Sequence, residues 1–269
     1  MYLEFYGLRE MPFNITPDPR FLFFSSRHRE AFDHLRYGIE HRKGFIEMTG
    51  EVGSGKTTLL RALLLHLGPN CKTALVLNPS LTETQLLRAI LHDFGLKPKG
   101  RDRLSHIEQL NEFLLEQHAL GFNVALIVDE AQDLLPDVME QVRLLSNLET
   151  DQHKLMQMVL AGQPELRHRL ARPDLRQLRQ RILVRCRLEP LNEEETAQYV
   201  AHRLAVAGGN GSVSFDADAV RLVHRHGEGI PRLINAICDS AMLACYVERL
   251  RCIGAAEVKR VLKDMDASR

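Results

Sequence analysis

The chain has 269 residues, enough for one large or two small domains with a sizeable hydrophobic core. Basic and acidic residues balance at 35 each, so no overall charge attracts the chain to nucleic acid or to an acidic membrane. The N-terminus lacks the pattern of a secretory signal, and no apolar run approaches the ~20 residues of a membrane-spanning helix. The five cysteines lack C-x-x-C spacing, and the seven-residue spacing of Cys238, Cys245 and Cys252 predicts small buried thiols on one helix face. We therefore expect a cytoplasmic protein without a transmembrane segment.

Residues 1–26 predict an extended arm packed on the body of the protein. Three prolines, Pro12, Pro17 and Pro19, disfavour regular helix in this segment. Its many aromatic residues disfavour disorder, because their side chains offer a large apolar surface for burial. Ser26 then has the residue type and position of a cap for a helix over 27–41.

The most informative stretch runs over residues 44–60, GFIEMTGEVGSGKTTLL. A predicted strand over 45–48 leads into Gly50–Thr57, which matches the phosphate-binding loop G-x-x-x-x-G-K-[ST]. Its glycines allow turns that point successive N–H groups inward, Lys56 would reach the outer phosphates, and Thr57 would place its hydroxyl on Mg²⁺. The alternative is a glycine-rich turn before an ordinary helix, which the flanking strand and helix disfavour. The chain is therefore predicted to bind a nucleoside triphosphate.

Strands and helices alternate along the rest of the first 189 residues, as in a layered α/β fold. Apolar runs predict four further strands, over 73–77, 124–128, 155–160 and 182–186. Helical patterns predict helices over 57–67, 82–94, 105–121 and 136–147, and capping boxes at Thr82 and Ser105 open the second and third of them. Two short arginine-rich helices, separated near Pro173, precede the last strand.

After Pro190 the pattern becomes helical. We expect helices over 192–207, 216–226, 231–249 and 255–265, and no strand after Cys186. The predicted organisation is an α/β nucleotide-binding domain over 27–189 with a five-stranded parallel sheet flanked by helices, an extended arm over 1–26 packed on that α/β core, and a small all-α lid domain over 190–269.

An acidic pair follows the clearest predicted strand, Val124–Val128. Asp129 and Glu130 stand where parallel α/β sheets hold their ligands, at the carboxyl end of a strand. Asp129 would hold Mg²⁺ through water, and Glu130 would orient and polarise an attacking water. Two solvated carboxylates at a strand exit are the alternative, which the upstream phosphate loop disfavours. No acceptor pocket for a kinase is evident, so we predict hydrolysis.

The segment Arg167–Arg187 contains eight arginines and one aspartate. A solvated basic face is one explanation of this run. The other is a subunit interface, because an arginine supplied in cis or in trans stabilises the transition state of phosphoryl transfer by several orders of magnitude in rate.

With these motifs the sequence resembles the AAA+ ATPases and, within them, the ExeA-type (general secretion pathway protein A-like) ATPases of secretion and pilus assembly. The resemblance covers nearly the whole chain. It is carried by FYGLREMPFNITPDPRFLF, GFIEMTGEVGSGKTTL, ALIVDEAQDL, RLLSNLET, LAGQPEL, LRQRI and GIPRLIN. The opening segment, LAGQPEL and GIPRLIN are specific to this branch, whereas the phosphate loop and the acidic pair occur more widely.

The resemblance implies roles for individual residues. Gln163 stands at the sensor 1 position, where the family normally has Asn, Ser or Thr, and Asn78 would restrain Glu130. Arg181 would be the arginine finger that reaches a neighbouring subunit, with Arg179 and Arg176 as alternatives, and Arg232 would be sensor 2. ATP and Mg²⁺ are the implied cofactors, and the residues implied to bind the nucleotide, besides Arg232, are Gly50, Glu51, Val52, Gly53, Ser54, Gly55, Lys56, Thr57 and Thr58.

The resemblance also implies a process. We expect a homo-oligomer, from dimer to hexamer, that binds ATP between subunits and drives assembly of an envelope secretion, exopolysaccharide or pilus-type machine through an inner-membrane partner. The alternatives are a DNA-binding AAA+ regulator of the transposition-ATPase type, which the neutral charge disfavours, and a nucleotide-gated scaffold with little hydrolysis. Larger members of the family carry a transmembrane helix and a periplasmic cell-wall-binding part, and we expect neither here.

Overall fold

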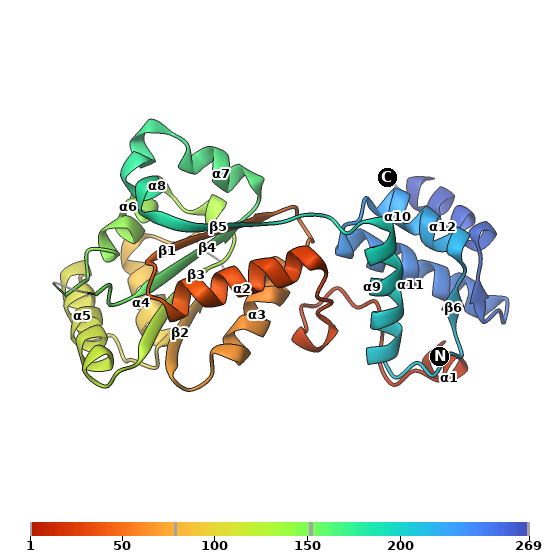
Figure 1. Ribbon diagram of the computed structural model, residues 1–269, viewed down its shortest axis with the longest axis horizontal. Helices are drawn as coiled ribbons and strands as arrows, with labels where there is room; N and C mark the ends of the chain where they lie inside the picture. The colour runs from red at the N-terminus through yellow and green to blue at the C-terminus, as the bar shows by residue number, and fades with distance from the viewer. Residues whose placement is uncertain (1, 78–79, 151–152, 268–269) are drawn as a thin grey trace. The chain divides into compact units, whose positions relative to one another are not determined.

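The computed structural model describes residues 2–77, 80–150 and 153–267. A five-stranded sheet contains β1 (Phe45–Gly50), β2 (Cys71–Val76), β3 (Asn123–Val128), β4 (Gln157–Gly162) and β5 (Ile182–Leu188). All neighbouring strands pair in parallel, in the order β2-β3-β4-β1-β5 (Figure 1). The predicted five-stranded parallel sheet is confirmed. Its carboxyl edge is therefore shared by the ends of all five strands.

Helices flank this sheet, as predicted. They are α2 (Ser26–Glu40), α3 (Lys56–Leu67), α4 (Glu83–Asp93), α5 (Arg103–Ala119), α6 (Pro136–Leu145), α7 (Pro164–Leu170) and α8 (Arg176–Arg181), with short 3-10 turns η2 (Ala131–Asp133) and η3 (Pro173–Leu175). The capping box predicted at Thr82 is present at the start of α4.

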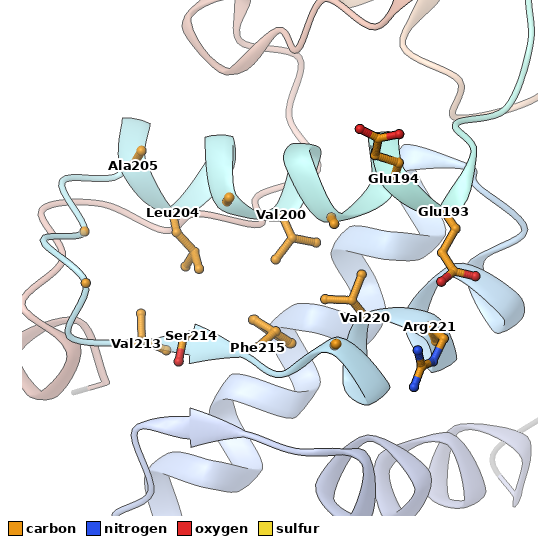
Figure 2. A pocket seen from close by; sticks show the side chains of 15 residues that line it. Glu193, Glu194, Val200, Leu204, Ala205, Val213, Ser214, Phe215, Val220 and Arg221 are labelled. Carbon is orange, nitrogen blue, oxygen red and sulfur yellow. The ribbon is translucent and has the colours of Figure 1, made fainter.

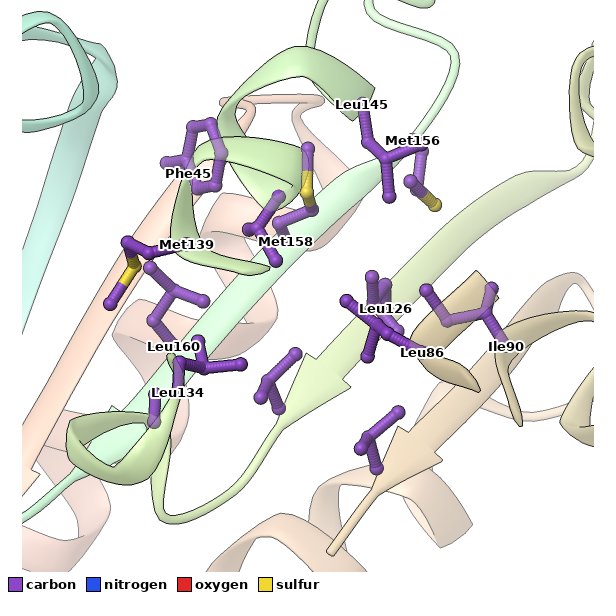
Figure 3. Close-up of a cluster of buried hydrophobic side chains, with 14 of the residues drawn as sticks. Phe45, Leu86, Ile90, Leu126, Leu134, Met139, Leu145, Met156, Met158 and Leu160 are labelled. Atoms are coloured by element: carbon purple, nitrogen blue, oxygen red, sulfur yellow. The ribbon is translucent and has the colours of Figure 1, made fainter. Parts of the chain in front are cut away.

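One face of the sheet carries the larger hydrophobic cluster (Figure 3). Leu126 of β3 and Leu160 of β4 point into it together with Leu86 and Ile90 of α4 and Met139 of α6, and all five side chains are fully buried. The strand residues between them face the other side, because successive side chains alternate across a strand.

The other face is covered by α2. A Cβ atom at Gly38 of α2 would lie 2.5 Å from the Cδ1 of Ile46 in β1, so only glycine lets the helix approach the strand this closely. The ring of Phe32 in α2 contacts that of His66 in α3 at 5.4 Å between centroids. Helices on both faces complete a three-layer α/β structure.

The C-terminal part of the chain is a bundle of four helices, α9 (Glu193–Val206), α10 (Ala217–Gly227), α11 (Pro231–Val247) and α12 (Ala255–Ala267). Asn192 and Glu195 form the predicted capping box of α9. Buried residues of all four helices share a second hydrophobic cluster, separate from that of the sheet.

The N-terminal arm packs into this second cluster, which corrects two expectations. The arm is partly helical rather than extended, with α1 (Tyr2–Tyr6) and the 3-10 turn η1 (Pro19–Phe21). Tyr6, Phe13 and Phe21 are buried among the lid helices, rather than on the α/β core as expected. Arg203 of α9 completes the attachment, since its guanidinium lies 4.5 Å from the ring of Phe21. The aromatic residues predicted burial but could not predict the surface that receives them.

The chain divides into two compact units. Residues 29–50 and 59–188 form a sheet unit, and residues 1–28, 51–58 and 189–269 form a lid unit. The phosphate loop thus groups with the arm and the lid helices. The boundaries expected from the sequence, 1–26, 27–189 and 190–269, remain a proposal for the domain organisation.

Three smaller expectations were wrong. Two-residue parallel strands β6 (Ser214–Phe215) and β7 (Cys252–Ile253) occur in the lid, where none was expected, because so short a pairing leaves no periodic pattern. Cys252 lies in β7 and is exposed, whereas Cys238 and Cys245 are buried as predicted. Helix α5 begins at Arg103, because its cap is the side chain of Asp102, which accepts the N–H of Ser105 at 3.0 Å; Ser105 is not the cap.

The lid unit also contains an open groove of about 810 Å³ between α9 and the segment formed by β6 and α10 (Figure 2). Val200 and Leu204 of α9 face Phe215 and Val220 across it. Separately, in the part of the chain that the structure describes, no helix is both long enough and apolar enough to cross a membrane.

Candidate functional site

The phosphate loop connects the end of β1 to the start of α3. Two of its glycines need the conformational freedom of that residue. Gly53 has φ +81° and Gly55 has φ +98°, a region that side-chain-bearing residues rarely adopt. A Cβ atom at Gly53 would also lie 2.4 Å from the Cβ of Arg232. The loop therefore has the backbone turns that the motif predicted.

The loop's polar side chains are all at least partly shielded from solvent. Ser54 and Lys56 are buried, and Glu51, Thr57 and Thr58 are partly buried. The Nζ of Lys56 donates to the carbonyl oxygen of Glu51 at 3.0 Å, within the loop itself. The ammonium group of Lys56 thus contacts the backbone of its own loop.

Arg232 meets the phosphate loop through its backbone as well as its side chain. It lies in the first turn of α11, directly after Pro231. Its N–H donates to the carbonyl oxygen of Gly53 at 3.2 Å, and its side chain covers Gly53. The structure thus brings the predicted sensor 2 residue to the loop within the lid unit.

The acidic pair lies at the carboxyl edge of the sheet. Asp129 directly follows β3, is 2% exposed, and accepts the N–H of Glu130 on its Oδ1 at 3.0 Å. Glu130 has φ +51° and ψ +39°, a left-handed conformation that turns the chain sharply into η2. This turn brings the side chain of Gln132, two residues further on, close to the carboxylate of Glu130.

Two glutamines hold that carboxylate. The Nε2 of Gln132 donates to the Oε2 of Glu130 at 2.9 Å, and the Nε2 of Gln163, directly after β4, donates to the same oxygen at 3.3 Å. The N–H of Gln163 donates in turn to the Oε1 of Gln132 at 3.0 Å. The structure therefore joins Glu130 to Gln163, the expected sensor 1 residue. Gln132 was missed, although an amide two residues after an acidic pair was visible in DEAQ.

Most arginines between Arg167 and Arg187 are exposed, but several also contact other parts of the sheet unit. Arg169 in α7 donates to the carbonyl oxygen of Gln132 at 2.7 Å, and burial lowers the pKa of its guanidinium. Arg185 in β5 pairs with the buried carboxylate of Glu47 in β1 at 3.2 Å. Arg169 is thus partly buried in the sheet unit, whereas Arg185 pairs with Glu47 from a half-exposed position.

The three finger candidates lie in α8, which immediately precedes β5. Arg181 donates to the Oδ1 of Asn147 at 2.7 Å and also to the hydroxyl of Ser146. Arg179 donates to the carbonyl oxygen of Ala171 at 3.4 Å, and Arg176 is exposed. All three thus approach the amino end of β5, whereas Asp129, Glu130 and Gln163 follow the carboxyl ends of their strands. A strand of this length separates the two edges by about 20 Å.

Asn78, the expected partner of Glu130 at the end of β2, lies outside the described residues. The partly buried cysteines Cys71 and Cys186 offer no nucleophile at neutral pH, since burial raises the pKa of Cys71 to about 11 and that of Cys186 to about 12.

The proposed metal ligands have the chemistry that Mg²⁺ prefers. The structure's described residues contain no group of three or more His, Cys, Asp or Glu side chains that could hold a metal by themselves. The hydroxyl of Thr57 in the lid unit and the carboxylate of Asp129 in the sheet unit are each hard oxygen donors, and Mg²⁺ typically binds few protein oxygens and adds waters and phosphate oxygens.

Known proteins agree with this fold and these motifs. Residues 39–170 match the family described as AAA domain. General secretion pathway protein A of Aeromonas hydrophila is 49% identical over 248 residues, which cover 91% of this chain and 45% of that protein. The chain thus spans less than half the length of this relative.

Solved structures share the fold at low sequence identity. Drosophila ORC bound to DNA has a TM-score of 0.70 and 20% identity, covering 94% of this chain and 64% of that chain. Cdc6p from Pyrobaculum aerophilum has a TM-score of 0.68 and 16% identity, covering 97% and 70%. These structures show the shared fold alone. The matched AAA domain and the 49% identity over 91% of this chain show that the chain belongs to the AAA ATPases of the general secretion pathway protein A type.

Proposed function

We propose that the chain binds ATP with Mg²⁺ between the subunits of a homo-oligomer and that hydrolysis drives assembly of an envelope secretion, exopolysaccharide or pilus-type machine. The observation that carries this proposal is that the candidate residues follow or precede opposite edges of one sheet. The phosphate loop, Asp129 and Glu130 leave the carboxyl edge, whereas the arginines of α8 lie at the amino edge.

Nucleotide binding rests on the loop from Gly50 to Thr58. Its backbone N–H groups would cradle the α- and β-phosphates, and Lys56 would swing from the carbonyl of Glu51 to the β- and γ-phosphates. Thr57 and Asp129 would hold Mg²⁺, which neutralises charge on the phosphate oxygens when bound. Arg232, already attached to Gly53, would report the state of the nucleotide to the lid.

Water activation falls to Glu130. Its carboxylate would accept a proton from the attacking water, or orient that water in line with the γ-phosphate. Gln132 and Gln163 both donate to the same one of its two oxygens. A carboxylate fixed by two amides loses little freedom when it orients a water, which favours hydrolysis over a purely structural role.

A guanidinium from another subunit would stabilise the transition-state charge. An α8 arginine at the amino edge of the sheet cannot serve a triphosphate at the carboxyl edge of its own subunit, about 20 Å away. A second subunit would present Arg181, or Arg179 or Arg176, to that triphosphate. Asn147 and Ser146 would hold Arg181 ready for this contact. The oligomer would range from a dimer to a hexamer.

The cellular process is proposed from the similarity to general secretion pathway protein A. We expect a partner protein at the inner membrane to receive the conformational change, with this chain on the cytoplasmic side. Asn78 would restrain Glu130 until that partner binds. Nucleic acid is not an expected partner, and ATP-dependent, salt-sensitive retention of DNA would contradict this part of the proposal.

The test compares Glu130→Gln, Arg181→Ala and the control Arg172→Ala, whose exposed guanidinium pairs with Asp174, two residues along the chain. Glu130→Gln should bind ATP normally, lose turnover about a hundredfold and shift toward a larger oligomer in light scattering. Arg181→Ala should keep ATP binding and lose turnover, whereas Arg172→Ala should match the unmodified protein.

Unchanged turnover in Glu130→Gln would exclude Glu130 as the activating group. Unchanged turnover in Arg181→Ala would indicate that Arg179 or Arg176 is the finger instead. If single alanine variants of Arg181, Arg179 and Arg176 all keep their turnover, a site shared between subunits through α8 is excluded.

A further inference from the structure

A buried histidine that the proposed reaction does not use holds the phosphate loop. His28 lies in the first turn of α2, and only 3% of its surface is exposed. Its Nε2 lies 3.0 Å from the carbonyl oxygen of Ser54 in the loop. A carbonyl oxygen only accepts hydrogen bonds, so Nε2 carries the proton and donates it to Ser54.

The other ring nitrogen is also satisfied. The Nδ1 of His28 lies 2.8 Å from the hydroxyl of Ser25, which is equally buried. The same hydroxyl accepts the backbone N–H of His28 at 3.3 Å, so its own proton is directed to Nδ1. Burial lowers the pKa of His28, against opposing effects from Ser54 and Glu195, so the ring is neutral at neutral pH. Ser25 therefore selects the tautomer that can donate to the loop.

The bond to Ser54 fixes the direction of one peptide group. In a trans peptide the C=O and the N–H point in opposite directions. Since the carbonyl of Ser54 points to His28, the N–H of Gly55 in the same peptide points to the opposite side of the loop. A Cβ atom at Gly55 would lie 3.3 Å from the Nε2 of His28, so the absent side chain also lets the loop approach the ring.

The start of α2 is itself anchored to the lid helices. The N–H and the hydroxyl of Ser26 both donate to the Oε1 of Glu195 in α9, at 3.2 and 3.0 Å. Arg27 pairs with Glu189 at 3.2 Å. The imidazole is therefore attached to a fixed support, and it can impose its direction on the loop.

We propose that His28 is a positioning residue for the phosphate loop, which holds the Ser54–Gly55 peptide so that the amide of Gly55 faces the phosphates of the bound nucleotide. This inference rests on the proposed nucleotide binding. It assigns to the segment Ser25–His28 a role that no motif indicated. Because the loop amides cradle the α- and β-phosphates, which ADP and ATP share, the residue contributes equally to the binding of both nucleotides.

The experiment compares His28→Leu, which keeps an apolar bulk without a donor, with His28→Gln, whose amide N–H can reach the Ser54 carbonyl. His34→Leu is the matched control, because His34 is an exposed histidine of the same helix. Isothermal titration with ADP and with ATP gives the affinities, and thermal unfolding of each variant checks its fold.

His28→Leu should weaken ADP and ATP by the same factor, about tenfold, the effect of one lost hydrogen bond. His28→Gln should recover most of that loss, and His34→Leu should bind like the unmodified chain. If His28→Leu does not fold, His28→Asn, whose amide is too short to reach the carbonyl, should show the same loss.

Two results would overturn the positioning role: affinities unchanged in the variants that lack a donor, or His28→Gln binding as weakly as His28→Leu. Neither result would contradict the proposed ATPase function, provided that the unmodified chain binds and hydrolyses ATP. Failure of the unmodified chain to bind either nucleotide would instead contradict the proposed function itself.

Discussion

At the scale of single residues, the backbone of Glu130 explains how the acidic pair is arranged. A left-handed conformation costs a residue with a side chain on the order of 1 kcal/mol, so the surrounding contacts must compensate for it. The hydrogen bonds from Gln132 and Gln163 to its carboxylate are contacts of this kind. Arg169 extends the support, since it holds the backbone of Gln132 from α7.

Gln132→Ala tests this support. The substitution removes the 2.9 Å hydrogen bond to Glu130 and the acceptor for the N–H of Gln163. We expect kcat to fall roughly ten- to a hundredfold while ATP affinity is unchanged, because a misplaced catalytic group slows the reaction without affecting the phosphate loop. Steady-state kinetics and equilibrium binding check this expectation.

Asp133→Ala is the matched control, because the exposed carboxylate of Asp133 accepts a hydrogen bond from the same Gln132 amide, at 3.1 Å. Equal losses of kcat in the two variants, or a loss of ATP affinity in Gln132→Ala, would show that Gln132 does not position Glu130.

At the scale of elements, Arg203 attaches the N-terminal arm to α9. This buried guanidinium donates to the carbonyl oxygens of Pro12 and Asn14 and lies over the ring of Phe21. Arg203→Ala should lower the free energy of unfolding by about 2–3 kcal/mol, through lost charged hydrogen bonds and a lost cation–π contact. Chemical denaturation measures this change, and limited proteolysis should detect earlier cleavage in residues 7–18.

The control for the arm is Arg221→Ala, since Arg221 is an exposed arginine of the lid that pairs with Asp218 one turn away. If both variants unfold at the same denaturant concentration, the arm is not attached through Arg203.

The cap of α5 gives a second test at this scale. Asp102→Ala should lower Tm by about 2–4 °C, because the N–H of Ser105 loses its acceptor. Hydrogen bonds from Ser105 hold the pKa of Asp102 below its ordinary value. A lowered folded-state pKa stabilises the protein above the unfolded pKa, and this stabilisation disappears as the pH falls through the folded value. The difference in Tm between the unmodified chain and Asp102→Ala should therefore become smaller at acidic pH.

Glu108→Ala distinguishes the observed cap from the one expected from the sequence. It would destabilise the helix only if Ser105 and Glu108 formed a capping box. A loss of Tm in Glu108→Ala without one in Asp102→Ala would contradict the observed start of α5.

These elements also show how far sequence reasoning reaches. Strands such as β3 were predictable because burial on both faces leaves a continuous apolar run, and α4 because its capping box is local. Contacts between distant segments were not predictable. The hydrogen bond from His28 to Ser54, the attachment of the arm by Arg203, and the pairing of β6 with β7 all join residues whose neighbours in the chain carry no matching signal.

The candidate site shows the same distinction between local sequence signals and contacts that depend on the fold. The phosphate loop and the acidic pair could be proposed from the sequence because their chemistry requires fixed residue types at fixed spacing. Gln132 was missed because its role depends on the left-handed turn at Glu130, which the residue type there does not indicate. The role of Gln163 was proposed only through the resemblance to a known family.

At the scale of the whole molecule, the sheet separates the groups that the proposed reaction needs. Parallel strands place the start of the phosphate loop and Glu130 at one edge and the α8 arginines at the other. A single subunit would therefore supply the phosphate loop and Glu130 to one site and an α8 arginine to a different site. Hydrolysis with an α8 finger therefore requires an oligomer, in which each site would combine Glu130 of one subunit with Arg181 of the next.

Mixing two inactive variants tests this central claim most directly. Glu130→Gln lacks the proposed water-activating group and Arg181→Ala lacks the proposed finger, and each should be inactive alone. In a randomly exchanged equimolar mixture, an interface that joins an intact Glu130 to an intact Arg181 should arise in about one quarter of the sites, whatever the size of a closed ring. We predict that the mixture regains about that fraction of the unmodified turnover. Two folded, nucleotide-binding variants that exchange subunits and regain no turnover would contradict a site shared between subunits.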